Sequence, residues 1–293
     1  MIARVTTMTM MQSSARNLQL AAQQLAVSQE RASGFRAITK PSDDPAGTAD
    51  AIAVRGAQRA NAQYARNIQD GNGWLATVDA ALSSTSTLIR RARDLTLQGA
   101  NDGALSPTQK EAVAAELETI RDLLLQEANR EYLGRSVFAG TSDAGYAFDA
   151  GYAFTGGAGS VERRIDEGAT VRIDVDGGEV FGVGAGSVFA TIDDIVGGLR
   201  AGTPVRGFID ALDVHHETVL AQHSAAGARH STVLAAGDRN LGRSVELEAR
   251  RSGLENLDIG RVAVELQMQG IAYQAALSAT ARAVRPTLMD FLR

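Results

Sequence analysis

Residues 40–55 read KPSDDPAGTADAIAVR, and this stretch predicts the start of a helix. Ser42, Asp43 and Asp44 offer side-chain oxygens to the free N–H groups of a first turn, and Pro45 suits the first helical position. The two acids also favour the positive end of the helix dipole. A metal site is the alternative, but a divalent cation usually recruits three or more protein oxygens and only one further acid lies nearby. We therefore expect a helix cap and joint here.

The helix that begins at this signal is expected to extend from about residue 44 to about residue 98. Apolar or small residues advance along it in steps of three or four, which is the period of one helix face: Ala53, Ala57, Ala60, Tyr64, Ile68, Gly71, Leu75, Val78, Leu82, Thr85, Ile89 and Ala92. The stripe continues through Gly71, so the DGNG segment at 70–73 does not end the helix. Upstream, a second seam predicts a coiled-coil helix ending near Gly34: Met8, Met11, Ala15, Leu18, Ala22, Leu25, Gln29 and Ala32.

A second helix start follows the turn at 99–109. Ser106 is the expected cap, Pro107 the first helical residue, and Gln109 completes a capping box. The helix after it places Val113, Leu117, Ile120, Leu124 and Ala128 on one face. Two helices joined by so short a link are expected to pack side by side and antiparallel.

The composition then changes, because residues 134–186 hold 13 of the 30 glycines and predict a small β-rich insert. In TVRIDVDGGEVFG, residues 170–182, alternation places Val171, Ile173 and Val175 on one side and Arg172 and Asp174 on the other. We expect Gly177 and Gly178 to form the hairpin turn. The hexamer DAGYAF occurs at 143–148 and again at 149–154, and we interpret it as a local duplication in a loop or edge strand that tolerates insertion.

Helical character returns near Ile192, continues after Pro204 to about Ser252, and ends in a helix from Leu257 to Leu292. The fold class expected is mainly α with a small β-rich insert, in which both chain ends form a long helical bundle or coiled coil. The expected organisation is an inner helix and joint at 1–43, a helical hairpin at 44–131, an outer insert at 132–203, a returning bundle helix at 204–256 and an inner C-terminal helix at 257–293.

The C-terminal helix is apolar on most of its circumference. Its 262–281 segment carries only Glu265 as a charge, but three glutamines and many alanines make it a poor membrane span, so we expect it to be enclosed in protein. Because each large side chain left uncovered forfeits about 1.5–3 kcal/mol, other copies of the chain are implied as partners. The predicted assembly core is Met8, Met11, Leu18, Leu25, Val264, Leu266, Met268, Ile271, Tyr273, Leu277, Val284, Leu288 and Phe291.

Little in the sequence indicates an enzyme. There are no cysteines, and a formal net charge of -5 gives no basic footprint for nucleic acid. His216, His223 and His230 are seven residues apart, about 10 Å on a helix, too far for two of them to share one ion. With Leu220, Gly227, Leu234 and Leu241 between and beyond them, they are expected in a packed or half-exposed seam. GVGAG and GGAG match no phosphate loop, and we expect no cofactor, metal or catalytic residues.

Both ends of the chain resemble the bacterial flagellin family. The resemblance is carried by KPSDDPAGTADAIAVR, YARNIQDGNGWLATVDAAL and LIRRARDLTLQGANDGALS near the N-terminus and by SGLENLDIGRVAVELQMQGIAYQAALSATA near the C-terminus. PSDDPAG, GRSVFAGT at 134–141, GGEVFG and the ending TLMDFLR favour a member located between hook and filament. Filament-forming members more often have alanine where Pro45 stands.

The resemblance implies a structural subunit of the bacterial flagellum that serves motility by self-assembly. Expected partners are other copies of the chain, hook-associated protein 1, flagellin, the flagellar export apparatus and an export chaperone. The N-terminus lacks an apolar signal region, so we expect export to the extracellular flagellum without a cleavable signal peptide and without membrane insertion. The alternatives are a short filament flagellin and, from another class, a cytoplasmic coiled-coil signalling or adaptor protein.

Overall fold

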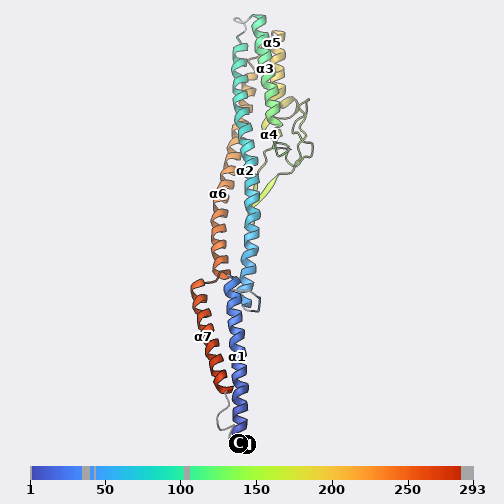
Figure 1. Ribbon diagram of the computed structural model, residues 1–293. Helices are drawn as coiled ribbons and strands as arrows, with labels where there is room; N and C mark the ends of the chain where they lie inside the picture. Colours follow the sequence, from blue (N-terminus) through green and yellow to red (C-terminus); the bar gives the residue numbers. More distant parts are fainter. Residues whose placement is uncertain (1, 35–39, 43, 102–105, 285–293) are drawn as a thin grey trace. The chain divides into compact units, whose positions relative to one another are not determined.

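The computed structural model of the chain describes residues 2–34, 40–42, 44–101 and 106–284, and within these the side chains of residues 2–8, 10, 283 and 284 are outside the described part. The elements are α1 (Ile2–Gly34), α2 (Pro45–Gly99), α3 (Pro107–Ala128), β1 (Glu131–Tyr132), β2 (Arg135–Ser136), β3 (Glu162–Asp166), β4 (Ala169–Arg172), α4 (Gly177–Phe181), η1 (Gly184–Gly186), α5 (Val188–Ala201), α6 (Phe208–Glu255) and α7 (Ile259–Val284) (Figure 1). This order confirms the predicted fold class. Among the described helices, none is long and apolar enough to cross a membrane.

The chain divides into two compact units. One comprises residues 1–59 and 244–293, and the other comprises residues 60–243. The borders fall inside α2 and α6, whereas the domain borders expected from the sequence lie at helix ends near 43 and 257. The long helices are therefore shared by both units, and the five-part organisation stays a prediction.

Both helix starts are built from local hydrogen bonds. An Oδ1 atom of Asp44 accepts the N–H of Gly47 at 2.9 Å, and α2 begins at the next residue, Pro45. Ser42 is exposed, and Asp43 lies outside the described residues. At α3, the hydroxyl of Ser106 accepts the N–H of Gln109 while the side chain of Gln109 accepts the N–H of Ser106 at 2.8 Å, with Pro107 as the first helical residue.

The core of the second unit follows the predicted stripe from Ile68 onward. Every predicted position from Ile68 to Ala92 is buried on α2, and the five predicted positions of α3 are buried as well. Upstream of Ile68 the prediction holds at Tyr64, which is partly buried and packs against the core. It was wrong at Ala53 and Ala60, which are exposed, while Ala51 and Val54 are buried instead. A stripe of small residues tolerates such a shift, since alanine gives only a weak hydrophobic signal on either face.

Three histidines of α6 contact three polar residues of α2 at matching intervals. The Nε2 atom of His216 lies 3.0 Å from the Ser86 hydroxyl, and that of His223 lies 2.7 Å from a carboxylate oxygen of Asp79. His230 completes the series at 2.7 Å from the side-chain oxygen of Asn72. All three histidines are half-buried, which confirms the predicted seam. The leucines at 220, 234 and 241 are exposed, because the α6 face that packs inward is Leu212, Val219, Ala226 and Val233.

The insert contains two hairpins, but its main turn is not where the sequence predicted. The β3–β4 hairpin turns at Glu167 and Gly168, and Gly168 has a φ of +77°, a region that favours glycine. Gly177 and Gly178 instead open the short helix α4, because the side chain of Asp176 accepts the N–H groups of residues 178 and 179. That cap fixes a helical first turn in place of a hairpin.

Alternation also failed at Asp174, which is 1% exposed. Its carboxylate accepts the N–H of Val161 at 2.9 Å and pairs with Arg172. These two partners satisfy the carboxylate, which is why it can be buried. The predicted alternation does not extend to Asp174 because β4 ends at residue 172.

The two DAGYAF copies lie in loop structure joined by one isolated β-bridge, as the sequence predicted, but they have unequal places in the insert. Phe148 of the first copy is 1% exposed and forms a β-bridge with Phe154 of the second. Tyr146 of the first copy is exposed, whereas its counterpart Tyr152 stacks on Phe189 and donates its hydroxyl hydrogen to Asp193 at 2.7 Å. Burial and this carboxylate raise the pKa of Tyr152 to about 12. Both copies therefore contribute to the aromatic core.

Candidate assembly surface

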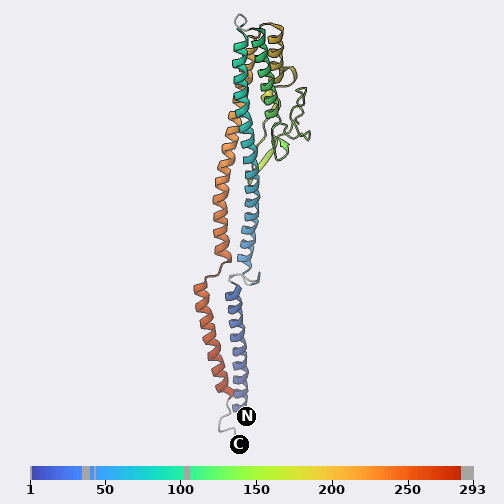
Figure 2. The same cartoon turned by 45° about the horizontal axis from the view of Figure 1, so that its top comes forward.

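Helices α1 and α7 form the candidate functional site, and they run antiparallel and side by side (Figures 1 and 2). Leu18 and Leu25 of α1 are partly buried, as are Leu266 and Tyr273 of α7. Val262 near the start of α7 is 8% exposed. Two helices can cover only one side of each other, so these residues mark the covered side of the pair.

A second apolar surface of the same pair is uncovered. Val264, Met268 and Ile271 of α7, three residues of the predicted assembly core, are 56–60% exposed in the single chain. We call the exposed apolar residues of the two helices the open face; they are Met11, Leu20, Val27, Ile259, Val264, Met268, Ile271 and Leu277. Val264, Met268 and Ile271 recur at i, i+4 and i+7 and so share one face of α7, and such an uncovered apolar stripe indicates an interaction site.

The predicted assembly-core residues divide between these two surfaces. Five belong to the open face and four lie on the covered side, while the side chains of Met8 and Val284, as well as Leu288 and Phe291, lie outside the described residues. Leu20, Val27 and Ile259 were not predicted from the sequence. Leu20 and Val27 are seven residues apart, a heptad signal that was hidden beside the stronger seam through Leu18 and Leu25.

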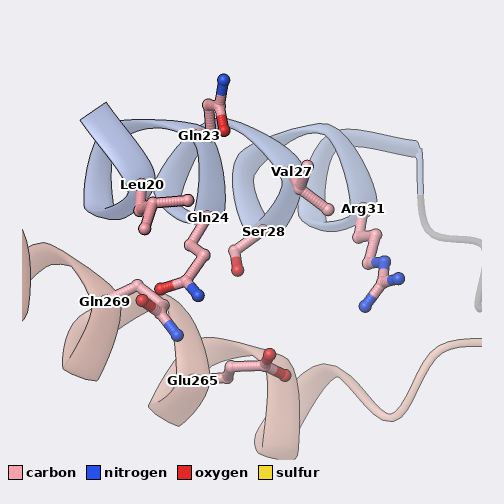
Figure 3. A pocket seen from close by; sticks show the side chains of 8 residues that line it. All are labelled: Leu20, Gln23, Gln24, Val27, Ser28, Arg31, Glu265 and Gln269. Atoms are coloured by element: carbon pink, nitrogen blue, oxygen red, sulfur yellow. The ribbon is translucent and has the colours of Figure 1, made fainter. Parts of the chain in front are cut away.

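Between α1 and α7 lies a polar cavity of about 340 Å³ (Figure 3). Gln24, Ser28 and Arg31 point from α1 toward Glu265 and Gln269 of α7. Ser28 is 7% exposed. The Nε atom of Arg31 is buried and has no hydrogen-bond partner. None of these five residues was predicted to form a site, because a polar residue inside a seam looks like one on a solvated face.

The neighbouring ends of α2 and α6, in the same unit, are joined by polar contacts. Arg55 donates to the carboxylate of Glu255 at 2.8 Å, and Gln58 donates to Glu248 at 3.0 Å. Elsewhere, burial lowers the pKa of His215, whose Nε2 atom lies 3.4 Å from the hydroxyl of Thr191. The described residues contain no group of three or more metal-capable side chains.

Comparisons with known proteins agree with this arrangement of helices. Residues 5–143 match the bacterial flagellin N-terminal helical region. Flagellar hook-associated protein 3 of Salmonella typhimurium is 28% identical over 280 residues, which cover 84% of this chain and 86% of that protein. Flagellin of Bacillus subtilis is 32% identical, but over only 37% of this chain.

The solved structures agree at the level of the fold. Flagellar hook-associated protein-3 from Legionella pneumophila has a TM-score of 0.61 at 13% identity, and the match covers 69% of this chain and 98% of that one. The chain is therefore similar, along most of its length, to flagellar hook-associated protein 3, and its N-terminal part matches the helical region of bacterial flagellin.

Proposed function

We propose that the chain is a structural subunit of the bacterial flagellum that forms the junction between hook and filament. The observation that carries this proposal is the open face of α1 and α7, which a single chain leaves in water. The match over most of the chain to a hook-associated protein, against about a third for flagellin, supports a junction subunit over a short filament flagellin.

The mechanism is assembly by burial. Each large side chain of the open face gains about 1.5–3 kcal/mol when a neighbour covers it, so even half of the eight residues would stabilise a contact by about 6 kcal/mol or more before the cost of association. The chain ends, residues 1–43 and 257–293, supply an inner coiled coil in this proposal. Residues 44–131 and 204–256 form a bundle, and the insert at 132–203 faces outward.

Partners and location follow from the same proposal. The chain assembles with other copies of itself and with flagellar components, which we take to be hook-associated protein 1 on one side and flagellin on the other. It reaches the extracellular flagellum through the flagellar export apparatus with the help of an export chaperone. In this role the chain needs no catalytic residues, cofactor or metal.

The test is genetic. A strain lacking the chain is expected to carry hooks without filaments and to release flagellin into the medium, and the intact gene is expected to restore filaments. Normal filaments without the chain would reject a junction role. If the chain dominates the mass spectrum of sheared filaments, it is a filament flagellin instead.

A substitution on the open face refines this test. Leu277 is 42% exposed in the single chain, so Leu277→Asp is expected to leave folding unchanged and to block assembly, since an assembled neighbour would bury an unpaired charge. Leu266→Asp should also block assembly, but it disturbs the α1–α7 pair itself. Leu241→Asp is the matched control, because Leu241 is an exposed leucine at 68% on α6. Full motility with Leu277→Asp would count against the open face as an assembly surface.

A further inference from the structure

The polar cavity between α1 and α7 has an unsatisfied donor. The Nε atom of Arg31 is buried without a hydrogen-bond partner. Leaving the buried donor of a charged group without a hydrogen bond costs folding free energy. Glu265 stands on the opposite wall and is partly buried (Figure 3). Within the described residues these two side chains form no ion pair, so each is available to a third group that enters between them.

The rim of the cavity is apolar and exposed. Leu20 and Val27 line it and are 55% and 46% exposed, and both belong to the open face. A helix that covers Leu20 and Val27 lies over the cavity, because both residues line it. Its apolar side chains would cover Leu20 and Val27, and one of its polar side chains would point between Arg31 and Glu265.

The charges of the cavity select the chemistry of that side chain. A carboxylate would pair with Arg31 but face the like charge of Glu265, and a cation would pair with Glu265 but face the like charge of Arg31, so either one adds a repulsion. A neutral amide avoids both, because its oxygen accepts from the Arg31 Nε–H while its NH₂ group donates to the Glu265 carboxylate. Outside the cavity lining, the terminal helices carry five exposed glutamines that can supply it: Gln12, Gln19, Gln29, Gln267 and Gln274.

We propose that the polar cavity receives a glutamine side chain from a second copy of this chain, and that this contact sets the axial position of one subunit against the next. The proposal rests on the proposed function, since it assumes that the open face is covered by another subunit. A single polar residue within an apolar helix seam is known to specify register in this way.

Cysteine cross-linking tests the occupant, because the natural chain has no cysteine and each engineered pair is unambiguous. One subunit carries Gln24→Cys on the cavity wall, and a second carries cysteine at one of the five exposed glutamines. Both are expressed together in a strain lacking the natural chain, flagella are isolated, and mild oxidation follows. A disulfide requires Cα atoms about 4.4–6.8 Å apart, so we expect dimers from one donor position in large excess over the other four.

Substitution of Arg31 supplies the second measurement. Arg31→Met keeps the apolar stem and removes the donor, and we expect it to lower the amount of subunit in isolated flagella by about tenfold or more. Arg16→Met is the matched control, since Arg16 is an exposed arginine of the same helix, and it should have no effect. Circular dichroism of the purified subunits checks that both variants fold alike.

The outcomes separate this inference from the proposed function. Filaments that form normally and contain the subunits, but yield no dimers at any donor position, would overturn the glutamine contact and leave the junction role intact. Equal effects of Arg31→Met and Arg16→Met would overturn it as well. Absence of the natural chain from isolated flagella would instead reject the proposed function.

Discussion

Removal of residues 149–154, one copy of DAGYAF, should destabilise the protein strongly. Deleting either copy leaves the same sequence, so the retained hexamer can fill only one of two sets of positions. If it occupies the first, the chain loses Tyr152 and Phe154, two partly buried rings, together with the hydrogen bond from Tyr152 to Asp193. If it occupies the second, the chain loses Phe148, which is 1% exposed.

The magnitude follows from these losses. Truncating a fully buried phenylalanine costs about 3–5 kcal/mol, so two half-buried rings cost about the same together. The hydrogen bond to a carboxylate adds about 1.5–3 kcal/mol. A loop shorter by six residues returns less than about 1 kcal/mol in closure entropy. The expected loss is therefore at least about 3 kcal/mol, a large part of the 5–15 kcal/mol typical of a folded protein.

Urea unfolding followed by tryptophan fluorescence measures this loss directly. Trp74 is the only tryptophan of the chain, is 2% exposed, and lies in the same unit as the repeat. Tyr152→Ala is expected to cost about 2–4 kcal/mol, whereas Tyr146→Ala, the same residue in the other copy, should stay within about 0.5 kcal/mol. If the deletion variant unfolds at the wild-type urea concentration, the aromatic core does not depend on the second copy.

Three further predictions concern protonation and local stability. Because the pKa of Tyr152 is raised to about 12, the unfolded chain releases its proton first, so stability should fall as pH rises from about 10 to 12; Tyr152→Phe should remove this part of the slope in melting temperature. Burial lowers the pKa of His215, so the unfolded chain binds its proton first and stability should fall as pH drops through about 6.5; an unchanged pH profile in His215→Gln would contradict this. Limited proteolysis of the free subunit should leave a fragment of about 45–255, because α1 and α7 cover only one side of each other; termini as resistant as the middle would argue that they need no neighbours.

The sequence predicted the long helices well because their signals are local. Caps such as Ser106 with Gln109, and apolar steps of three and four from Ile68 to Ala92, depend only on residues within a turn or two. The half-buried seam of His216, His223 and His230 was predicted for the same reason, since heptad spacing is visible in the sequence.

What the sequence did not predict depends on contacts between distant residues. Gly177 and Gly178 looked like a turn, but Asp176 caps a helix there, and Gly177 lies so close to Phe138 that an added Cβ would meet the Phe138 carbonyl at 3.0 Å. The exposed row of α6 leucines and the buried carboxylate of Asp174 are set by packing that no local period reveals. On the assembly surface, the apolar stripe of α7 was predicted, but the cavity at Arg31 was not, since it arises only when α1 and α7 pair.

The histidine contacts between α2 and α6 repeat every seven residues on both helices, so these contacts alone do not fix the axial register of the two helices. If α6 slid by one heptad, about 10.5 Å, His216 would meet Asp79 and His223 would meet Asn72, and two of the three contacts would survive. The unrepeated pair at the end of the series does not permit this. The side chain of Asn240 donates to the carbonyl of Asn61 at 2.9 Å, and the side chain of Asn61 donates to the carbonyl of Asn240 at 3.1 Å. The same slide would bring Asn240 beside Val54, and both side-chain amides would lose these hydrogen bonds. One asparagine pair thus fixes the axial register of two helices whose histidine contacts are periodic.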